Sequence, residues 1–207
     1  VVQCRSTKAF PIHTVDRPLN KAMAGARWLL NRTGIAASNI WEAGGLIRGN
    51  TTTPYPNLQY HFGPVGFEYE GETIKLRQAF ALHIDQLRPK SRGHIALKSS
   101  DPAAKPAMHF NYLSDPHDLA ELVEGVHKAR DLIAQKGFDE FRGVEIDPGP
   151  DVKTDKDIER AIRKMTVTDY HPCGTCRMGS GADAVVDAEL RVHGIEGLRV
   201  IDASVMP

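Results

Sequence analysis

The feature that most limits the possible folds is a series of short segments between residues 57 and 110 in which apolar and polar side chains alternate. The alternation is clearest in residues 80–87, and Gly-Pro or Pro-rich breaks separate the segments. A period of two is typical of half-buried β-strands, and Gly and Pro favour the turns that join them. Because no helical pattern interrupts the series, we expect these strands to pair antiparallel.

Three other segments have the spacing of helices with one buried apolar face. They are residues 19–32, 115–136 and 154–165. The second is the longest, and Ser114 or Asp115 can cap it ahead of Pro116. These patterns predict an α+β fold, in which an antiparallel sheet of residues 57–110 is covered by the second and third helices.

The two ends of the chain carry weaker patterns. Residues 1–18 contain Pro11 and Pro18 and predict an irregular or short extended lead-in. Short strands are expected at residues 185–187, 190–192 and 198–202. The chain begins without Met and stops directly after a strand-like run, so we expect a fragment of a longer protein.

Composition narrows the class of protein. The 207 residues are 41% hydrophobic and 25% charged, within the globular range, and the formal net charge is zero. Such a balance argues against binding nucleic acid or an anionic membrane. The three cysteines are too few for a disulfide framework, which fits a reducing compartment. We expect a cytoplasmic protein, with peripheral association at the inner membrane as the alternative.

The densest cluster of reactive side chains is the loop Tyr170-His171-Pro172-Cys173-Gly174-Thr175-Cys176-Arg177-Met178-Gly179. About twenty residues later the chain reads Leu198-Arg199-Val200-Ile201-Asp202-Ala203-Ser204. Three chemistries fit the loop: a Cys-x-x-Cys redox or metal pair, half of a zinc deaminase motif, or an imidazole general base beside a cofactor.

The cysteines fit the first two chemistries poorly. A zinc deaminase also needs His-x-Glu, and none of the nine histidines is followed by Glu at the second position. A low-pKa thiol needs a helix after Cys173, but the following residues are rich in glycine. A structural zinc site needs four ligands, and beside the two thiols the chain offers only His171 and the distant His193. We therefore expect Cys173 and Cys176 to be packing residues and predict no metal site.

A nucleotide-binding pattern in the same region is a coincidence of spacing. Residues 179–184 fit Gly-x-Gly-x-x-Ala, but they follow no hydrophobic strand and open no helix. The chain therefore carries no phosphate-binding glycine loop of its own.

Two side chains are candidates for a direct chemical role. His171 can take a proton near neutral pH, and Pro172 and Gly174 constrain its backbone setting, although most histidines are structural. Glu42 stands between Trp41 and a Gly-Gly pair in an apolar stretch. Base rates alone favour a solvated or structurally paired role for such an acid.

The loop motif, together with Val186-Asp187, Arg191-Val192-His193-Gly194 and Gly197 through Pro207, resembles the C-terminal region of the glucose-methanol-choline flavoprotein oxidoreductases. The resemblance also includes Ser91-Arg92-Gly93-His94-Ile95, Gln59-Tyr60-His61-Phe62 and the segment from Ser38 to Gly45. It covers nearly all of this chain but less than half of a full family member, and it is greatest to members that oxidise choline.

The resemblance implies an FAD enzyme that oxidises a primary alcohol, with choline as the expected small-molecule substrate. His171 matches the histidine that assists removal of the hydroxyl proton. Glu42 matches the carboxylate that faces the trimethylammonium group, with Trp41 and Tyr170 as candidate aromatic walls. Asp202 and Ala203 match the segment of the family that lies against the ribityl and phosphate part of FAD. The electron acceptor cannot be read from this segment.

The resemblance also implies a division of the chain. Residues 1–168 would form the substrate-binding domain, mostly antiparallel sheet plus helices, and residues 169–207 the histidine loop with an incomplete piece of the FAD domain. The family's glycine-rich loop and second active-site residue would lie outside this chain, so we expect the fragment alone to be inactive and without tightly bound FAD. The alternatives are a broader-range primary alcohol dehydrogenase of the same family, a non-catalytic binding domain and a zinc module.

Overall fold

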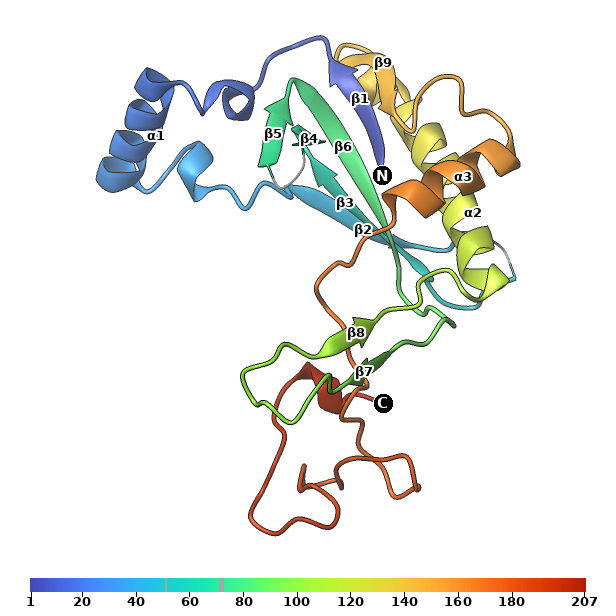
Figure 1. Ribbon diagram of the computed structural model, residues 1–207. Coiled ribbons are helices and arrows are strands. Elements are labelled where there is room, and N and C mark those ends of the chain that lie inside the picture. Colours follow the sequence, from blue (N-terminus) through green and yellow to red (C-terminus); the bar gives the residue numbers. More distant parts are fainter. Residues whose placement is uncertain (51, 71–72) are drawn as a thin grey trace. The chain divides into compact units, whose positions relative to one another are not determined.

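The computed structural model describes residues 1–50, 52–70 and 73–207, which form two compact units (Figure 1). Unit 1 consists of Val1–Lys90 and Asp115–Met165, and unit 2 of Ser91–Ser114 and Thr166–Pro207. Unit 2 therefore combines two segments that are far apart in the sequence, residues 91–114 and the C-terminal residues 166–207. The predicted boundary at residues 168 and 169 divides the chain by function, and it stays a prediction.

Unit 1 is built on a five-stranded antiparallel sheet with the strand order β2-β3-β6-β1-β9. The strands are β1 (Val2–Ser6), β2 (Ala43–Ile47), β3 (Leu58–Gly63), β6 (Ala79–Gln86) and β9 (Arg142–Asp147). The predicted α+β class with an antiparallel sheet is confirmed, as are the strands corresponding to β3 and β6.

The predicted limits of the sheet, residues 57–110, are wrong at both ends. β1 and β9 extend the sheet on one side and β2 on the other. β1 lies in the segment that was expected to be an irregular or short extended lead-in, but it is a strand of the sheet with four of its five residues buried. At the other limit, the strands near residues 94–109 belong to unit 2.

A second hairpin of unit 1 consists of β4 (Gly66–Glu70) and β5 (Thr73–Arg77). It is joined to β1 through the side chain of Gln3. The Gln3 Oε1 atom accepts a hydrogen bond from the Phe67 backbone at 2.8 Å, and Nε2 donates to the Phe67 carbonyl at 3.2 Å. The buried Gln3 amide therefore holds the hairpin against β1.

Helix α2 (Pro116–Ile133) packs on the sheet through the predicted apolar stripe. The predicted cap is present, because the Asp115 side chain accepts a hydrogen bond from the His117 backbone. The Tyr60 hydroxyl donates to the Gly125 carbonyl at 2.7 Å. A Cβ atom at Gly125 would lie 2.7 Å from Ile84 Cγ2, so a glycine is needed where the helix approaches the sheet.

Two further helices complete unit 1. Helix α3 (Asp155–Met165) packs beside α2, and Thr154 and Asp157 cap it reciprocally, as predicted. Helix α1 (Pro18–Asn31) also forms where it was predicted, but none of its residues is buried. The expected buried face of α1 is therefore wrong, because no described element covers its apolar side chains. Three short 3₁₀ turns join these elements: η1 (Pro11–Thr14), η2 (Ile35–Ala37) and η3 (Lys136–Phe138).

Unit 2 contains the hairpin of β7 (His94–Ala96) and β8 (Ala107–His109), and the turn η4 (Ala203–Val205) near its end. The short strands predicted between residues 185 and 202 are wrong as strands, since they form only isolated bridges. Two glycines with a left-handed φ in this region, Gly194 (77°) and Gly197 (74°), turn the chain before a ladder can extend. No helix in the described ranges has the length and apolar character needed to cross a membrane.

Candidate functional site

Glu42 lies at the edge of a large cavity in unit 1. The cavity has a volume of about 1180 Å³. Aromatic residues form much of its wall: Phe10, Tyr60, Phe62, Phe80, Phe138 and Phe141. Of the described residues that line it, two carry a charge, Glu42 and Arg27. The cavity thus combines a mainly apolar, aromatic wall with one carboxylate.

The carboxylate of Glu42 is held by its own chain segment. The Ser38 hydroxyl donates a hydrogen bond to Glu42 Oε1 at 2.7 Å, and the Glu42 backbone donates to the Phe62 carbonyl at 3.1 Å. Glu42 remains exposed to solvent. The residue is therefore tied to the edge of β3 while its charge stays accessible to a ligand.

Trp41 belongs to a different cluster from the cavity wall. Its ring lies 4.7 Å from that of His83, 5.9 Å from that of Phe67 and 6.1 Å from that of His61, between centroids. Trp41 is not among the residues that line the cavity at Glu42. Neighbouring residues of an extended chain point to opposite sides, which accounts for the separation.

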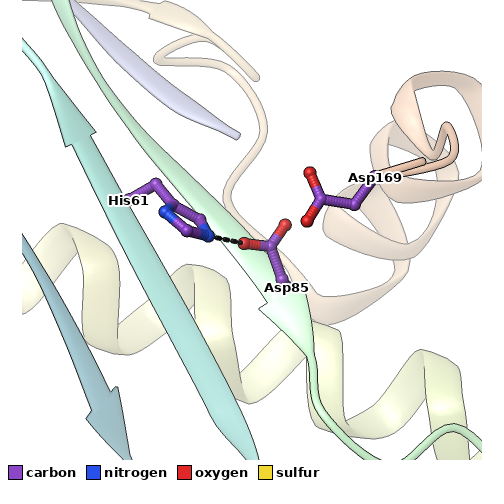
Figure 2. Close-up of side chains that lie close together, drawn as sticks. All are labelled: His61, Asp85 and Asp169. Atoms are coloured by element: carbon purple, nitrogen blue, oxygen red, sulfur yellow. Dashed lines mark ion pairs between the residues drawn. The ribbon is translucent and has the colours of Figure 1, made fainter. Parts of the chain in front are cut away.

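Sequence reasoning missed the polar residues around Trp41. His61 Nε2 lies 3.0 Å from Asp85 Oδ2 and 2.8 Å from the Gln59 Nε2 atom. Figure 2 shows the His61 ring and the Asp85 carboxylate pointing toward one another. The pairings His61 with His83 and Gln59 with Asp85 put all four on neighbouring positions of β3 and β6. The signal was available, because polar residues recur at every second position of both predicted strands.

In unit 2, the histidine loop and the C-terminal turn form one structure. The Cys176 backbone donates to the Ser204 carbonyl and the Met178 backbone to the Val205 carbonyl, both at 2.9 Å. Gly174 adopts a φ of 89°, a left-handed conformation that favours glycine. Two motifs separated by about thirty residues are therefore joined by backbone hydrogen bonds.

His171 is presented to solvent by this loop. Its Nδ1 atom lies 3.3 Å from Asp169 Oδ2, and 82% of its side-chain surface is exposed. Tyr170, which precedes it, has a φ of 61° and is also highly exposed. Asp169 was not predicted from the sequence, although a carboxylate two residues before a candidate base is a recognisable signal.

Asp202 and Ala203 lie in the C-terminal turn η4. Asp202 Oδ1 accepts a hydrogen bond from the Ser204 backbone at 2.8 Å, and the hydrogen bonds from Ser204 lower the pKa of the Asp202 carboxyl. Both residues are exposed. An ionised acceptor next to a side chain as small as alanine suits the close approach of a hydroxyl-bearing group such as the polyol part of FAD.

The cysteines of the loop are free thiols, with Cys173 exposed and Cys176 half-buried. Among the described residues, neither belongs to a group of three side chains placed to hold a metal ion. The stretch after Cys176 forms bends and turns, and no helix begins at residues 179–184.

These arrangements define two chemical capacities. In unit 1, a carboxylate beside aromatic side chains suits an organic cation that has left water. In unit 2, an exposed imidazole paired with a carboxylate suits proton transfer.

Residues 89–207 match a family model described as GMC oxidoreductase, and the chain belongs to this family. Within the family, the chain is 48% identical over 188 residues to an oxygen-dependent choline dehydrogenase of Cronobacter sakazakii and 46% identical to that of Chromohalobacter salexigens. Each alignment covers 91% of this chain and 34% of the relative, so the chain spans about a third of their length.

The fold also matches a solved structure. A formate oxidase of Aspergillus oryzae, described in connection with FAD modification, superposes with a TM-score of 0.85 at 26% identity. That alignment covers the whole of this chain and 41% of the oxidase.

Proposed function

We propose that this chain is part of an FAD-dependent oxidoreductase that oxidises choline to betaine aldehyde. Its likeness to two choline dehydrogenases supports the substrate, and the observation that carries the proposal is the Glu42 carboxylate at the aromatic cavity. A quaternary ammonium cannot donate a hydrogen bond, so its recognition depends on a counter-charge and aromatic faces. The cavity in unit 1 offers both.

Each predicted residue has a distinct role in the proposal. Glu42 balances the trimethylammonium charge beside the aromatic wall of its cavity. Trp41, which packs against His83 outside that cavity, and Tyr170, which belongs to unit 2, remain the candidate aromatic contacts. His171 receives the hydroxyl proton, and the Asp169 carboxylate lies 3.3 Å from its Nδ1 atom.

The hydride acceptor would be FAD, held in the full-length protein. In this chain, Asp202 and Ala203 would lie against its ribityl and phosphate portion, on the turn that is hydrogen-bonded to the histidine loop. We keep residues 1–168 as the proposed substrate-binding domain and residues 169–207 as the part that carries the histidine loop and the cofactor segment. We place the full-length enzyme in the cytoplasm or at the periphery of the inner membrane, to be decided by cell fractionation.

The proposed role of Glu42 is tested by comparing choline with its neutral isostere 3,3-dimethylbutanol. In the full-length enzyme, Glu42→Gln is expected to raise the KM for choline by at least tenfold, or about 1.4 kcal/mol, and to leave the isostere nearly unaffected. Glu140→Gln is the matched control, because Glu140 is exposed and pairs with Lys8 at the surface. Equal losses for both substrates in Glu42→Gln would exclude the cation-binding role.

The proposed role of His171 is tested against a non-catalytic binding domain. In full-length His171→Ala, flavin reduction by choline is expected to slow by about 100-fold or more, while the fold and choline binding persist. Unchanged flavin reduction would eliminate the assignment. A broader-range alcohol dehydrogenase remains the second candidate, because the Ser38 hydroxyl already donates a hydrogen bond to the Glu42 carboxylate. Equal turnover of choline and the isostere by the unmodified enzyme would favour this candidate.

A further inference from the structure

The hairpin of unit 2 pairs two histidines that the proposed function does not use. His94 on β7 is directly opposite His109 on β8. Their rings stack with centroids 4.5 Å apart and an angle of 19° between the planes. Both residues are exposed, and among the described side chains neither imidazole forms an ion pair with a carboxylate.

The register that brings the two imidazoles together is fixed by the backbone at the open end of the hairpin. A Cβ atom at Gly93 would lie 2.1 Å from the His109 carbonyl oxygen, so the strands approach there as closely as only glycine permits. Next to it, Asn111 Nδ2 donates a hydrogen bond to the Arg92 carbonyl at 3.0 Å. A one-residue slip would put the histidines on opposite faces, and these contacts oppose it.

We propose that His94 and His109 form a binding site for a divalent transition-metal ion, with Cu²⁺ bound most tightly. Imidazole is a good ligand for copper, nickel and zinc, and affinity rises to its maximum at Cu²⁺. Metal–nitrogen bonds of about 2.0 Å require two nitrogens roughly 3 Å apart for adjacent coordination positions. Stacked rings on paired residues reach this separation by small side-chain rotations, without movement of the backbone, and water completes the coordination at this exposed position.

The site follows from the hairpin alone and is independent of the proposed alcohol oxidation. An ion held by both histidines bridges β7 and β8, and therefore stabilises the hairpin by binding only its paired form. Because imidazole must be neutral to coordinate a metal, affinity falls as the solution is acidified. Neither effect is expected of two rings that stack only through packing.

The test is a Cu²⁺ titration of the 207-residue chain, followed by calorimetry and by the nitrogen hyperfine pattern in electron paramagnetic resonance. All variants are made in a Cys173→Ser, Cys176→Ser background, because accessible thiols bind and reduce copper. The expected result is one ion with two equatorial imidazole nitrogens. His94→Gln or His109→Gln alone weakens that affinity by about tenfold or more, and the double variant loses little beyond either single one.

His127→Gln is the matched control, because His127 is a partly exposed histidine that pairs with Asp155 at 2.8 Å. This variant is expected to keep the two-nitrogen signal and the full affinity. Circular dichroism of each variant checks that the chain remains folded. A signal with a single nitrogen, or an affinity that the double variant retains, would show that the two rings only pack against each other and would overturn the proposal.

Discussion

The buried carboxylate of Glu121 provides a quantitative test of how α2 is joined to the sheet. Glu121 is 6% exposed and accepts hydrogen bonds from Asn57 Nδ2 at 2.7 Å and from Gln86 Nε2 at 2.5 Å. Asn57 is 1% exposed and also accepts a hydrogen bond from the Gly49 backbone at 2.7 Å. One side chain on the helix therefore fixes the ends of β3 and β6 and the loop between β2 and β3.

Replacing Glu121 by Ala removes both acceptors while the donors stay in place. The Asn57 amide remains buried, and an unsatisfied donor of this kind costs about 1–3 kcal/mol. Gln86 loses less, roughly 0.5–1 kcal/mol, because it is half-buried and still reaches Asp118 Oδ1 at 3.1 Å. We therefore expect a loss of about 2–4 kcal/mol in the free energy of unfolding. Glu121→Gln keeps one acceptor oxygen and the shape of the side chain, so it is expected to lose about half as much.

The measurement is urea unfolding followed by circular dichroism at 222 nm, which reports on the helices. With a slope of roughly 2 kcal/mol per M, the expected loss lowers the midpoint by about 1–2 M and leaves the slope unchanged. Glu140→Ala is the control, because this exposed acid pairs with Lys8 at the surface and should cost less than about 1 kcal/mol. If Glu121→Ala lowers the free energy of unfolding no more than the control does, the hydrogen bonds of Glu121 with Asn57 and Gln86 do not hold α2 to the sheet.

Three further predictions use the same structure. Burial raises the pKa of the Cys4 thiol to about 11, so at pH 8 iodoacetamide should label exposed Cys173 and spare Cys4. Early labelling of Cys4 in the folded chain, detected by mass spectrometry, would contradict this prediction. Hydrogen bonds from Ser204 lower the pKa of Asp202, so the stabilisation of the C-terminal turn is complete above about pH 4 and is lost as the pH falls through the lowered value. The Ser204 amide chemical shift should follow this titration and become independent of pH in Asp202→Asn. Gly93→Ala places a Cβ atom 2.1 Å from a carbonyl oxygen of the partner strand and should speed amide exchange throughout the β7–β8 hairpin, whereas unchanged exchange would contradict the close approach.

The sequence predicts the parts of the fold that depend on local patterns. The apolar stripe and cap give α2 within a few residues of its ends, and the alternation gives β3 and β6. β1 escapes prediction because its partners are distant, Val2 opposite Leu82 on one side and Gln3 opposite Asp147 on the other. The alternation of apolar and polar residues in β1 covers only Val2 to Arg5, which is too short to distinguish a strand of the sheet from an extended lead-in.

The candidate site, like the fold, has a part that local sequence motifs predict and a part that depends on long-range packing. His171 is suggested by its loop motif, but the hydrogen bonds that join this loop to Ser204 and Val205 follow from long-range folding that spacing along the chain does not encode. Likewise, Trp41 and Glu42 are adjacent in sequence, yet Trp41 packs against His83 while Glu42 lines the cavity. Pattern reasoning finds which residues are chemically unusual, whereas tertiary packing decides which of them share a pocket.

Glu42 and His171 belong to different units, but each follows closely after a residue with a left-handed backbone conformation. Ile40, two residues before Glu42, has a φ of 72°, and Tyr170, directly before His171, has a φ of 61°. A branched or aromatic residue in the left-handed region costs about 1–3 kcal/mol, and such conformations persist where surrounding contacts enforce them, often at functional sites. At Ile40 the enforcing contact is visible: Ser38 accepts a hydrogen bond from the Ile40 backbone at 3.0 Å while its hydroxyl donates to Glu42. The same serine thus stabilises the strained turn and orients the carboxylate, which is the arrangement expected if the position of Glu42 matters more than local stability.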